Sequence, residues 1–185
     1  MKRLFWLVPG VLFSLLHCAF FRAIDLRPYP PAERSLFLQN IRNETFQADA
    51  NLELTEWVRR ELHRRGNFLI ARERSGARLI LSGNLEVYRR EGRMLDDYRN
   101  PVRYELILAA RMHLRRLDSG GQSEIGQELL AASVEYSELE GYVETEHTAR
   151  QRALQLLAAR IANFAEQSFV NFHGQPPAAA SDPGE

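Results

Sequence analysis

Apolar and polar residues alternate along three stretches in the middle of the chain. The clearest is Val102–Leu114, where most of the intervening polar positions are charged: Arg103, Glu105, Arg111, His113 and Arg115. Ala77–Tyr88 repeats the pattern, with Leu79, Leu81, Leu85 and Val87 on one face, and Glu128–Tyr136 follows it. A period of two predicts strands with one buried face and one solvated face. Short turn-forming segments between them predict an antiparallel meander.

Two other stretches repeat with the period of an α-helix. Residues 51–65 carry Leu54, Val58 and Leu62, and residues 146–170 carry Leu154, Leu157, Ile161 and Phe164. Both patterns predict an amphipathic helix with one apolar stripe. Shorter apolar runs at 35–41 and 67–71 predict two short strands.

The predicted elements follow the order β-α-β-β-β-β-α. A sheet with one apolar face and two helices with one apolar stripe each pack most economically as two layers. We therefore expect an α+β two-layer sandwich over residues 34–173. Its two helices should cover one face of a mostly antiparallel four- to five-stranded sheet, and the other face should stay polar.

The N-terminus has the pattern of an export signal. Lys2 and Arg3 precede an uncharged apolar stretch that ends before Cys18, the only cysteine. A basic start and a short apolar run are typical of a secretory signal, and the run is too short to span a bilayer. Residues 1–17 are therefore predicted as a signal peptide and Cys18 as the acylated first residue of a lipoprotein. His17 is larger than the residue that usually precedes such a cysteine, so an ordinary signal peptide with an incidental cysteine stays an alternative.

The two ends of the mature chain differ from the predicted domain. Residues 18–33 contain three prolines, which forbid a helix and predict an extended leader. Residues 174–185 contain no large apolar side chain, so we expect a disordered tail.

Length and charge narrow the class of protein. A chain of 185 residues allows one domain of ordinary size. Its formal net charge is zero, with 19 Arg against 13 acidic residues in 19–116 and 3 Arg against 11 in 117–185. This balance does not indicate nucleic-acid binding, which usually requires a strongly basic domain.

Enzymatic motifs are absent from the sequence. The five histidines fall on separate predicted elements without metal-ligand spacing, and one cysteine cannot build a zinc site. There is no nucleophile elbow and no glycine-rich phosphate loop. We expect neither catalysis, nor a metal, nor a cofactor.

Several segments together resemble one family, the lipopolysaccharide-assembly lipoprotein LptE. The resemblance begins at Cys18-Ala19-Phe20-Phe21-Arg22 and continues through the polar turn Asn43-Glu44-Thr45. It includes the strand Ala77–Leu85, where Arg78 replaces the family's usual acid, and the segments Tyr98-Arg99-Asn100 and Ala149–Phe164. It covers roughly Cys18 to Phe169.

The resemblance implies a function that the residue pattern alone does not. Family members are outer-membrane lipoproteins that face the periplasm, plug the lumen of the β-barrel LptD, help it assemble and contact lipopolysaccharide. Arg99, in its Tyr-Arg-Asn setting, is then the first candidate for contacting lipopolysaccharide, followed by Arg93, Arg89, Arg90 and Arg103 around the charged connection 89–100. Arginine forks suit phosphate groups.

Two alternatives stay open. The arginines can instead pair with Glu91, Asp96 and Asp97 or solvate the connection. The chain can also be another envelope lipoprotein, resembling TolB N-terminal or CsgG domains or a transporter's auxiliary component, that acts as a binding or assembly module.

Overall fold

The structure, a computed structural model, describes residues 24–95, 97–98, 101–118, 120–137 and 144–174. The predicted signal peptide, Cys18, the first part of the leader and residues 175–185 of the predicted tail lie outside these residues. In chain order the elements are β1 (Ser35–Leu38), β2 (Arg42–Asn43), α2 (Ala50–Arg65), β3 (Leu69–Ile70), the short 3-10 helix η2 (Arg74–Gly76), β4 (Leu79–Leu95), β5 (Pro101–Asp118), β6 (Gly121–Ser137) and α3 (Glu146–Gly174).

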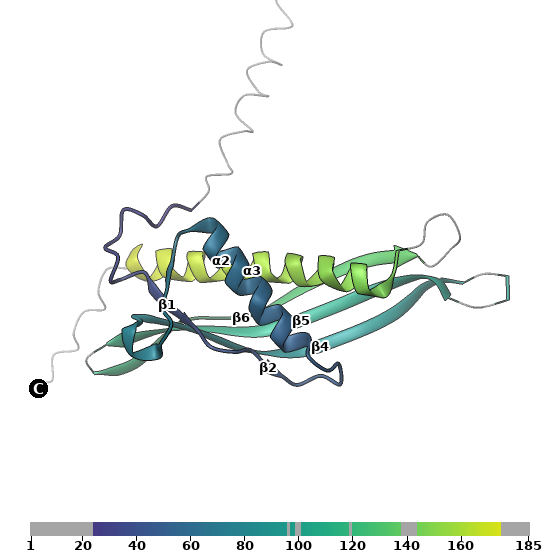
Figure 1. The fold of residues 1–185 in the computed structure, drawn as a ribbon, viewed down its shortest axis with the longest axis horizontal. Coiled ribbons are helices and arrows are strands. Elements are labelled where there is room, and N and C mark those ends of the chain that lie inside the picture. The colour runs from purple at the N-terminus through teal and green to yellow at the C-terminus, as the bar shows by residue number, and fades with distance from the viewer. Residues whose placement is uncertain (1–23, 96, 99–100, 119, 138–143, 175–185) are drawn as a thin grey trace, which may run out of the picture.

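Both helices lie on the same side of one sheet (Figure 1), which confirms the predicted α+β sandwich. The strand order is β3-β1-β4-β5-β6, and β2 pairs with β4 beyond the end of β1. Helix α3 runs along β5 and β6, while α2 crosses the sheet obliquely and packs against α3. The β4–β5 hairpin extends to one end of the molecule, and the N-terminal segment lies at the other end.

The sheet is mixed, and most of its pairing is antiparallel, as the sequence predicted. The long strands β4, β5 and β6 pair antiparallel, as expected of a meander. The short strands β1, β2 and β3 all pair parallel to their neighbours. This difference follows from α2, because a helix that connects β1 to β3 along one face returns the chain in its original direction.

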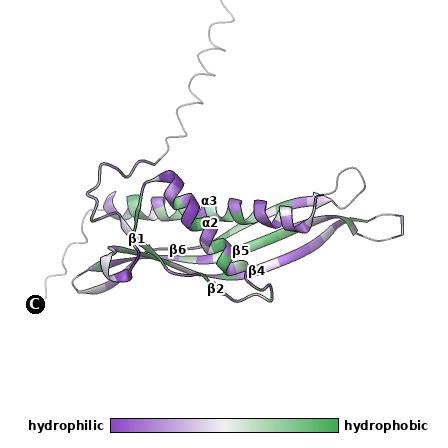
Figure 2. Ribbon diagram, in the orientation of Figure 1, coloured by the Kyte–Doolittle hydropathy of each residue, from purple (hydrophilic) through white to green (hydrophobic). Residues whose placement is uncertain are grey.

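The long strands extend further than their alternation indicated. Strand β4 runs to Leu95 and takes in most of the predicted connection 89–100, while β6 begins at Gly121 rather than at Glu128. Cross-strand pairing to β5 holds these ends in the sheet. Figure 2 shows that the part of β4 near the hairpin is largely hydrophilic. Gly174, assigned to the predicted tail, is the last residue of α3.

One predicted face assignment is wrong. The register of β4 shifts between Leu85 and Val87, so Val87 lies opposite Ala109 and Tyr88 lies opposite the buried Leu108. Such a bulge inserts one residue and exchanges the two faces of the strand beyond it. Val87 therefore joins Ala109 on the face away from the helices, and that face is less uniformly polar than predicted.

The hydrophobic core lies between this sheet and the two helices. The predicted stripes of both helices are buried, as are the predicted inward residues of β6: Leu130, Ala132, Val134 and Tyr136. On β5, five inward residues are fully buried, namely Leu106, Leu108, Ala110, Met112 and Leu114. The alternation of apolar residues thus identified the core face of β5 and β6 correctly.

Gly83 allows β4 and β5 to approach closely inside this core. A Cβ at this position would overlap the carbonyl oxygen of Arg111 and the sulfur of Met112. We expect Gly83→Ala to lower the free energy of unfolding by about 1–3 kcal/mol, because overpacking a filled core forces backbone shifts. Urea unfolding measures this change. Gly76→Ala is the matched control, since its Cβ would meet nothing within 4 Å, and equal effects of the two substitutions would contradict the packing argument.

Strand β6 forms the free edge of the long antiparallel part of the sheet. Two arginines of α3 reach over this edge, where Arg160 donates a hydrogen bond to the carbonyl of Ala131 and Arg152 donates one to the carbonyl of Glu135 at 2.9 Å. The helix thus supplies partners for backbone groups that an edge strand otherwise leaves to solvent.

Candidate functional site

The candidate arginines lie on two paired strands rather than together in a loop. Arg89, Arg90 and Arg93 belong to β4, and Arg103 belongs to β5. Arg99, the first candidate, is outside the residues that the structure describes. Because neighbouring residues of a strand point to opposite faces, this placement separates Arg89 from Arg90.

Three of these arginines have carboxylate partners. Arg89 lies 2.8 Å from Glu91, and Arg93 donates from Nε to Glu105 at 2.6 Å. Hydrogen bonds from Ser133 and then from Arg93 lower the pKa of Glu105 below its usual range. Arg89 therefore forms an ion pair with Glu91, one of the partners that the sequence predicted. Arg93 instead pairs with Glu105 of the neighbouring strand β5, which was not among the predicted partners.

Arg90 occupies a different environment on the helix side of the sheet. Its guanidinium lies 3.7 Å from the ring centroid of Tyr104 and 3.3 Å from a carboxylate oxygen of Glu146. Since Glu146 is the first residue of α3, these contacts connect the hairpin to the start of the helix. The structure thus gives Arg90 a packing role between strand and helix.

Exposed apolar side chains gather at the end of the same hairpin. Met94 is 52% exposed, Leu95 is 53% exposed and Tyr98 is 86% exposed. Arg93 and Arg103, on the two paired strands, are next to them, and Arg103 has no ion-pair partner among the described residues. Cationic and apolar groups at one end of the molecule suit an anionic amphiphile such as a phosphorylated lipid.

The sequence analysis did not identify these apolar residues as part of the site. Met94 and Leu95 interrupt an otherwise charged stretch, and that interruption was the available signal. It could be interpreted only once β4 was known to continue to Leu95 and carry both side chains to the hairpin end.

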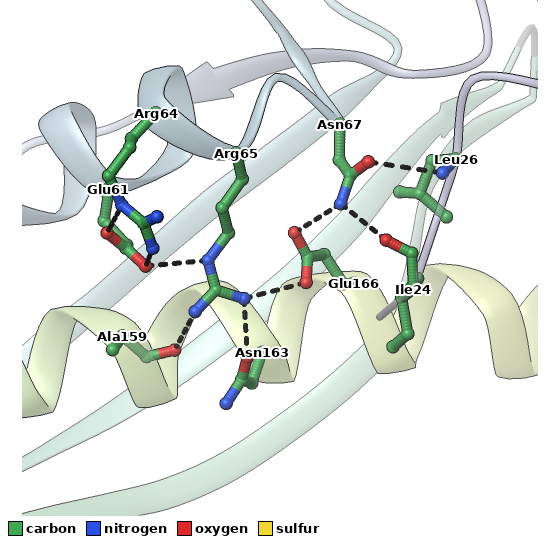
Figure 3. Close-up of polar contacts among 9 residues, drawn as sticks. All are labelled: Ile24, Leu26, Glu61, Arg64, Arg65, Asn67, Ala159, Asn163 and Glu166. Atoms are coloured by element: carbon green, nitrogen blue, oxygen red, sulfur yellow. Dashed lines mark hydrogen bonds and ion pairs between the residues drawn. The ribbon is translucent and has the colours of Figure 1, made fainter. Parts of the chain in front are cut away.

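The second notable region is the junction where the N-terminal segment joins the folded body (Figure 3). Asn67 accepts a hydrogen bond from the amide of Leu26 at 3.3 Å and donates one to the carbonyl of Ile24 at 3.0 Å. It also donates to Glu166 of α3 at 2.7 Å, and both Asn67 and Glu166 are buried. One amide side chain thereby holds the N-terminal segment against α3.

A set of charged residues completes this junction. Arg65 contacts Glu166 and Glu61, each at 2.8 Å, and donates to the carbonyl of Ala159 at 3.1 Å. Hydrogen bonds from Arg64 and then from Arg65 lower the pKa of Glu61 to about 2, although partial burial acts in the opposite direction. The end of α2 is therefore joined to α3 through Arg65, which contacts one carboxylate on each helix.

The described residues hold neither a metal-binding cluster nor a membrane-spanning helix. Among them, no group of three His, Cys, Asp or Glu residues could hold a metal ion. Their helices include none with the length and apolar content that crossing a bilayer requires.

Comparison with protein families matches residues 34–164 to the model of LptE, described as lipopolysaccharide-assembly. No curated protein matches the chain. Among solved structures, protein XCC0632 from Xanthomonas campestris aligns with a TM-score of 0.52 and 14% identity over 82% of this chain and 95% of its own. The hypothetical protein CT253 from Chlamydia trachomatis aligns with a TM-score of 0.51 and 14% identity, over 72% and 98%. Rare lipoprotein B from Shewanella oneidensis aligns at a TM-score of 0.45 and 16% identity, over 75% and 96%. At these identities the likeness to the first two structures, whose TM-scores exceed 0.5, shows a shared fold.

Proposed function

Because this chain belongs to the LptE family of lipopolysaccharide-assembly proteins, we propose that it is an outer-membrane lipoprotein that plugs an LptD-type β-barrel. In this role it faces the periplasm, is held to the membrane by lipid on Cys18, assists assembly of the barrel and contacts lipopolysaccharide in transit. The observation that carries the proposal is the family match, which covers most of the folded domain.

The shape and surface of the domain are compatible with a place inside a barrel. The sheet face away from the helices carries ion pairs such as Arg111–Glu86, at 2.7 Å, beside smaller apolar residues such as Val87 and Ala109. The lumen of an outer-membrane barrel is polar, so a plug needs a largely polar surface. The long hairpin gives the plug a narrow end with both charge and apolar area.

Capture of the partner tests this function directly. The tagged full-length chain is purified from detergent-solubilised outer membranes, and the proteins bound to it are identified by mass spectrometry. We expect an LptD-type barrel in equal amount. Recovery of an inner-membrane transporter instead, or of no barrel, would overturn the proposal and favour an auxiliary envelope lipoprotein.

The hairpin end is the proposed contact for lipopolysaccharide. Replacing Arg93 and Arg99 together by glutamine is expected to weaken lipopolysaccharide binding by a factor of about 100 or more, since charge-assisted hydrogen bonds to phosphate contribute about 1.5–3 kcal/mol each. Binding is measured with immobilised full-length protein. The matched control replaces Arg59 and Arg72, two arginines away from the hairpin, by glutamine, so that both double variants have the same net charge. Equal affinities of the two double variants would move the contact elsewhere.

A further inference from the structure

A small polar hollow lies on the sheet face away from the helices, where β1, β2, β4 and β5 meet. Its volume is about 140 Å³, and its lining residues are Gln39, Arg42, Ser82, Gly83, Asn84, His113 and Arg115. None of these described lining residues is a carboxylate. The hollow therefore offers hydrogen-bond donors and positive charge without an acid in its wall.

The hollow lies where the pairing along β4 passes from β1 to β2. The amide of Gln39 donates to Leu81, and pairing with β4 resumes at Arg42, which lies opposite Asn84. Between them Ile41 is drawn to the helix side, where its amide donates to Thr55 at 3.1 Å and its carbonyl accepts from Asn51 at 2.8 Å. The chain leaves the outer face at this point, and the side chains of Gln39 and Arg42 border the resulting gap.

The two arginines of the hollow differ from most others on this protein. Within the described ranges, the guanidinium groups of Arg42 and Arg115 have no hydrogen-bond or ion-pair partner, although both residues are paired in the sheet through their backbones. The neighbouring Arg111, by contrast, is neutralised by Glu86. Glu124, which lies opposite Arg115 on β6, contacts His113 Nδ1 at 2.9 Å and is not among the residues that line the hollow.

We propose that this hollow binds a single phosphate group, as the free anion or as a phosphate monoester. Two guanidinium groups supply paired N–H donors that match phosphate oxygens, and Gln39, Ser82 and Asn84 add neutral polar groups. The volume suits one small oxoanion and is well below that of sites for drug-sized ligands. The site is separate from the hairpin end, because Ser82 and Arg93 are roughly 36 Å apart along β4.

Equilibrium dialysis with radiolabelled inorganic phosphate tests the proposal on the full chain in uncharged detergent. We expect saturable binding to one site per chain, and at least a tenfold loss of affinity in the double variant Arg42→Gln, Arg115→Gln. The matched control is Arg72→Gln, Arg74→Gln, which removes two exposed arginines and the same charge from a loop elsewhere. Thermal unfolding of both variants verifies that they are folded.

The source of the phosphate is resolved by competition. Glucosamine 1-phosphate that competes better than inorganic phosphate indicates a phosphorylated sugar headgroup, and equal competition indicates the free anion. Absence of saturable binding to the unmodified protein, or an equal loss in the control variant, would overturn the proposal. The result does not depend on capture of a barrel, so either proposal can fail without the other.

Discussion

Replacing Glu166 by alanine is expected to lower the free energy of unfolding by about 3 kcal/mol. Its carboxylate is buried and holds two partners, Arg65 at 2.8 Å and Asn67 at 2.7 Å. Removing one member of a buried ion pair leaves the other charge without its compensation, which is more costly than loss of an exposed pair. Arg65 keeps its contact with Glu61, so the expected loss lies at the lower end of the range for buried pairs.

Urea unfolding of the variant measures this loss, and two comparisons make the result specific. Glu56→Ala removes a solvent-exposed partner of Arg59 and should cost about 1 kcal/mol or less. In the Glu166 variant, hydrogen exchange at the amide of Leu26 should accelerate, because that amide is held by Asn67. A cost no larger than that of Glu56→Ala, with unchanged exchange at Leu26, would refute the role assigned to Glu166.

The second large effect is expected at Cys18. Replacing it by alanine should transfer the mature protein from the membrane fraction to the soluble fraction, because each buried methylene of an acyl chain contributes about 0.8 kcal/mol to membrane binding. Fractionation of cells and labelling with radioactive palmitate measure the change. Retention in the membrane without label would exclude the lipid anchor.

These two variants separate attachment from folding. Glu166→Ala loosens the segment at Ile24 and Leu26 but leaves Cys18 in place, so membrane association should persist. Cys18→Ala removes the anchor but leaves the buried contacts of Asn67, so the unfolding free energy should not change. His17→Ala is a useful third variant, since a small residue before the cysteine should favour processing.

The sequence predicted the fold well where the signal was local. The alternation in Val102–Leu114 predicted the core face of β5 correctly. Thr145, a residue type that favours the start of a helix, caps α3 by accepting a hydrogen bond from the amide of Thr148 at 3.3 Å. The parallel pairing of β1 was not predictable in this way, because it depends on where the chain returns after α2. The face of Val87 was predicted wrongly because a bulge leaves no mark in an apolar–polar pattern.

The candidate site was predicted less completely, since its interactions join distant parts of the chain. The partner of Arg93 is Glu105, which becomes its neighbour only through the register of β4 and β5. The hollow around Arg42 and Arg115 combines residues from three strands with Gln39, which follows β1, and these residues form no motif in the sequence. Glu166 lies next to the apolar stripe of α3, but the sequence does not indicate its partner Asn67, which is 99 residues away.

The arginines that cover the edge of β6 also bear on how a barrel could close around this protein. A barrel closes when its first and last strands pair, and an open strand edge in its lumen would compete for the same backbone groups. Arg160 and Arg152 already bond to the carbonyls of Ala131 and Glu135. Within the proposed function, β6 would therefore be a poor competitor, and the plug could stay beside an unfinished barrel without becoming part of its wall.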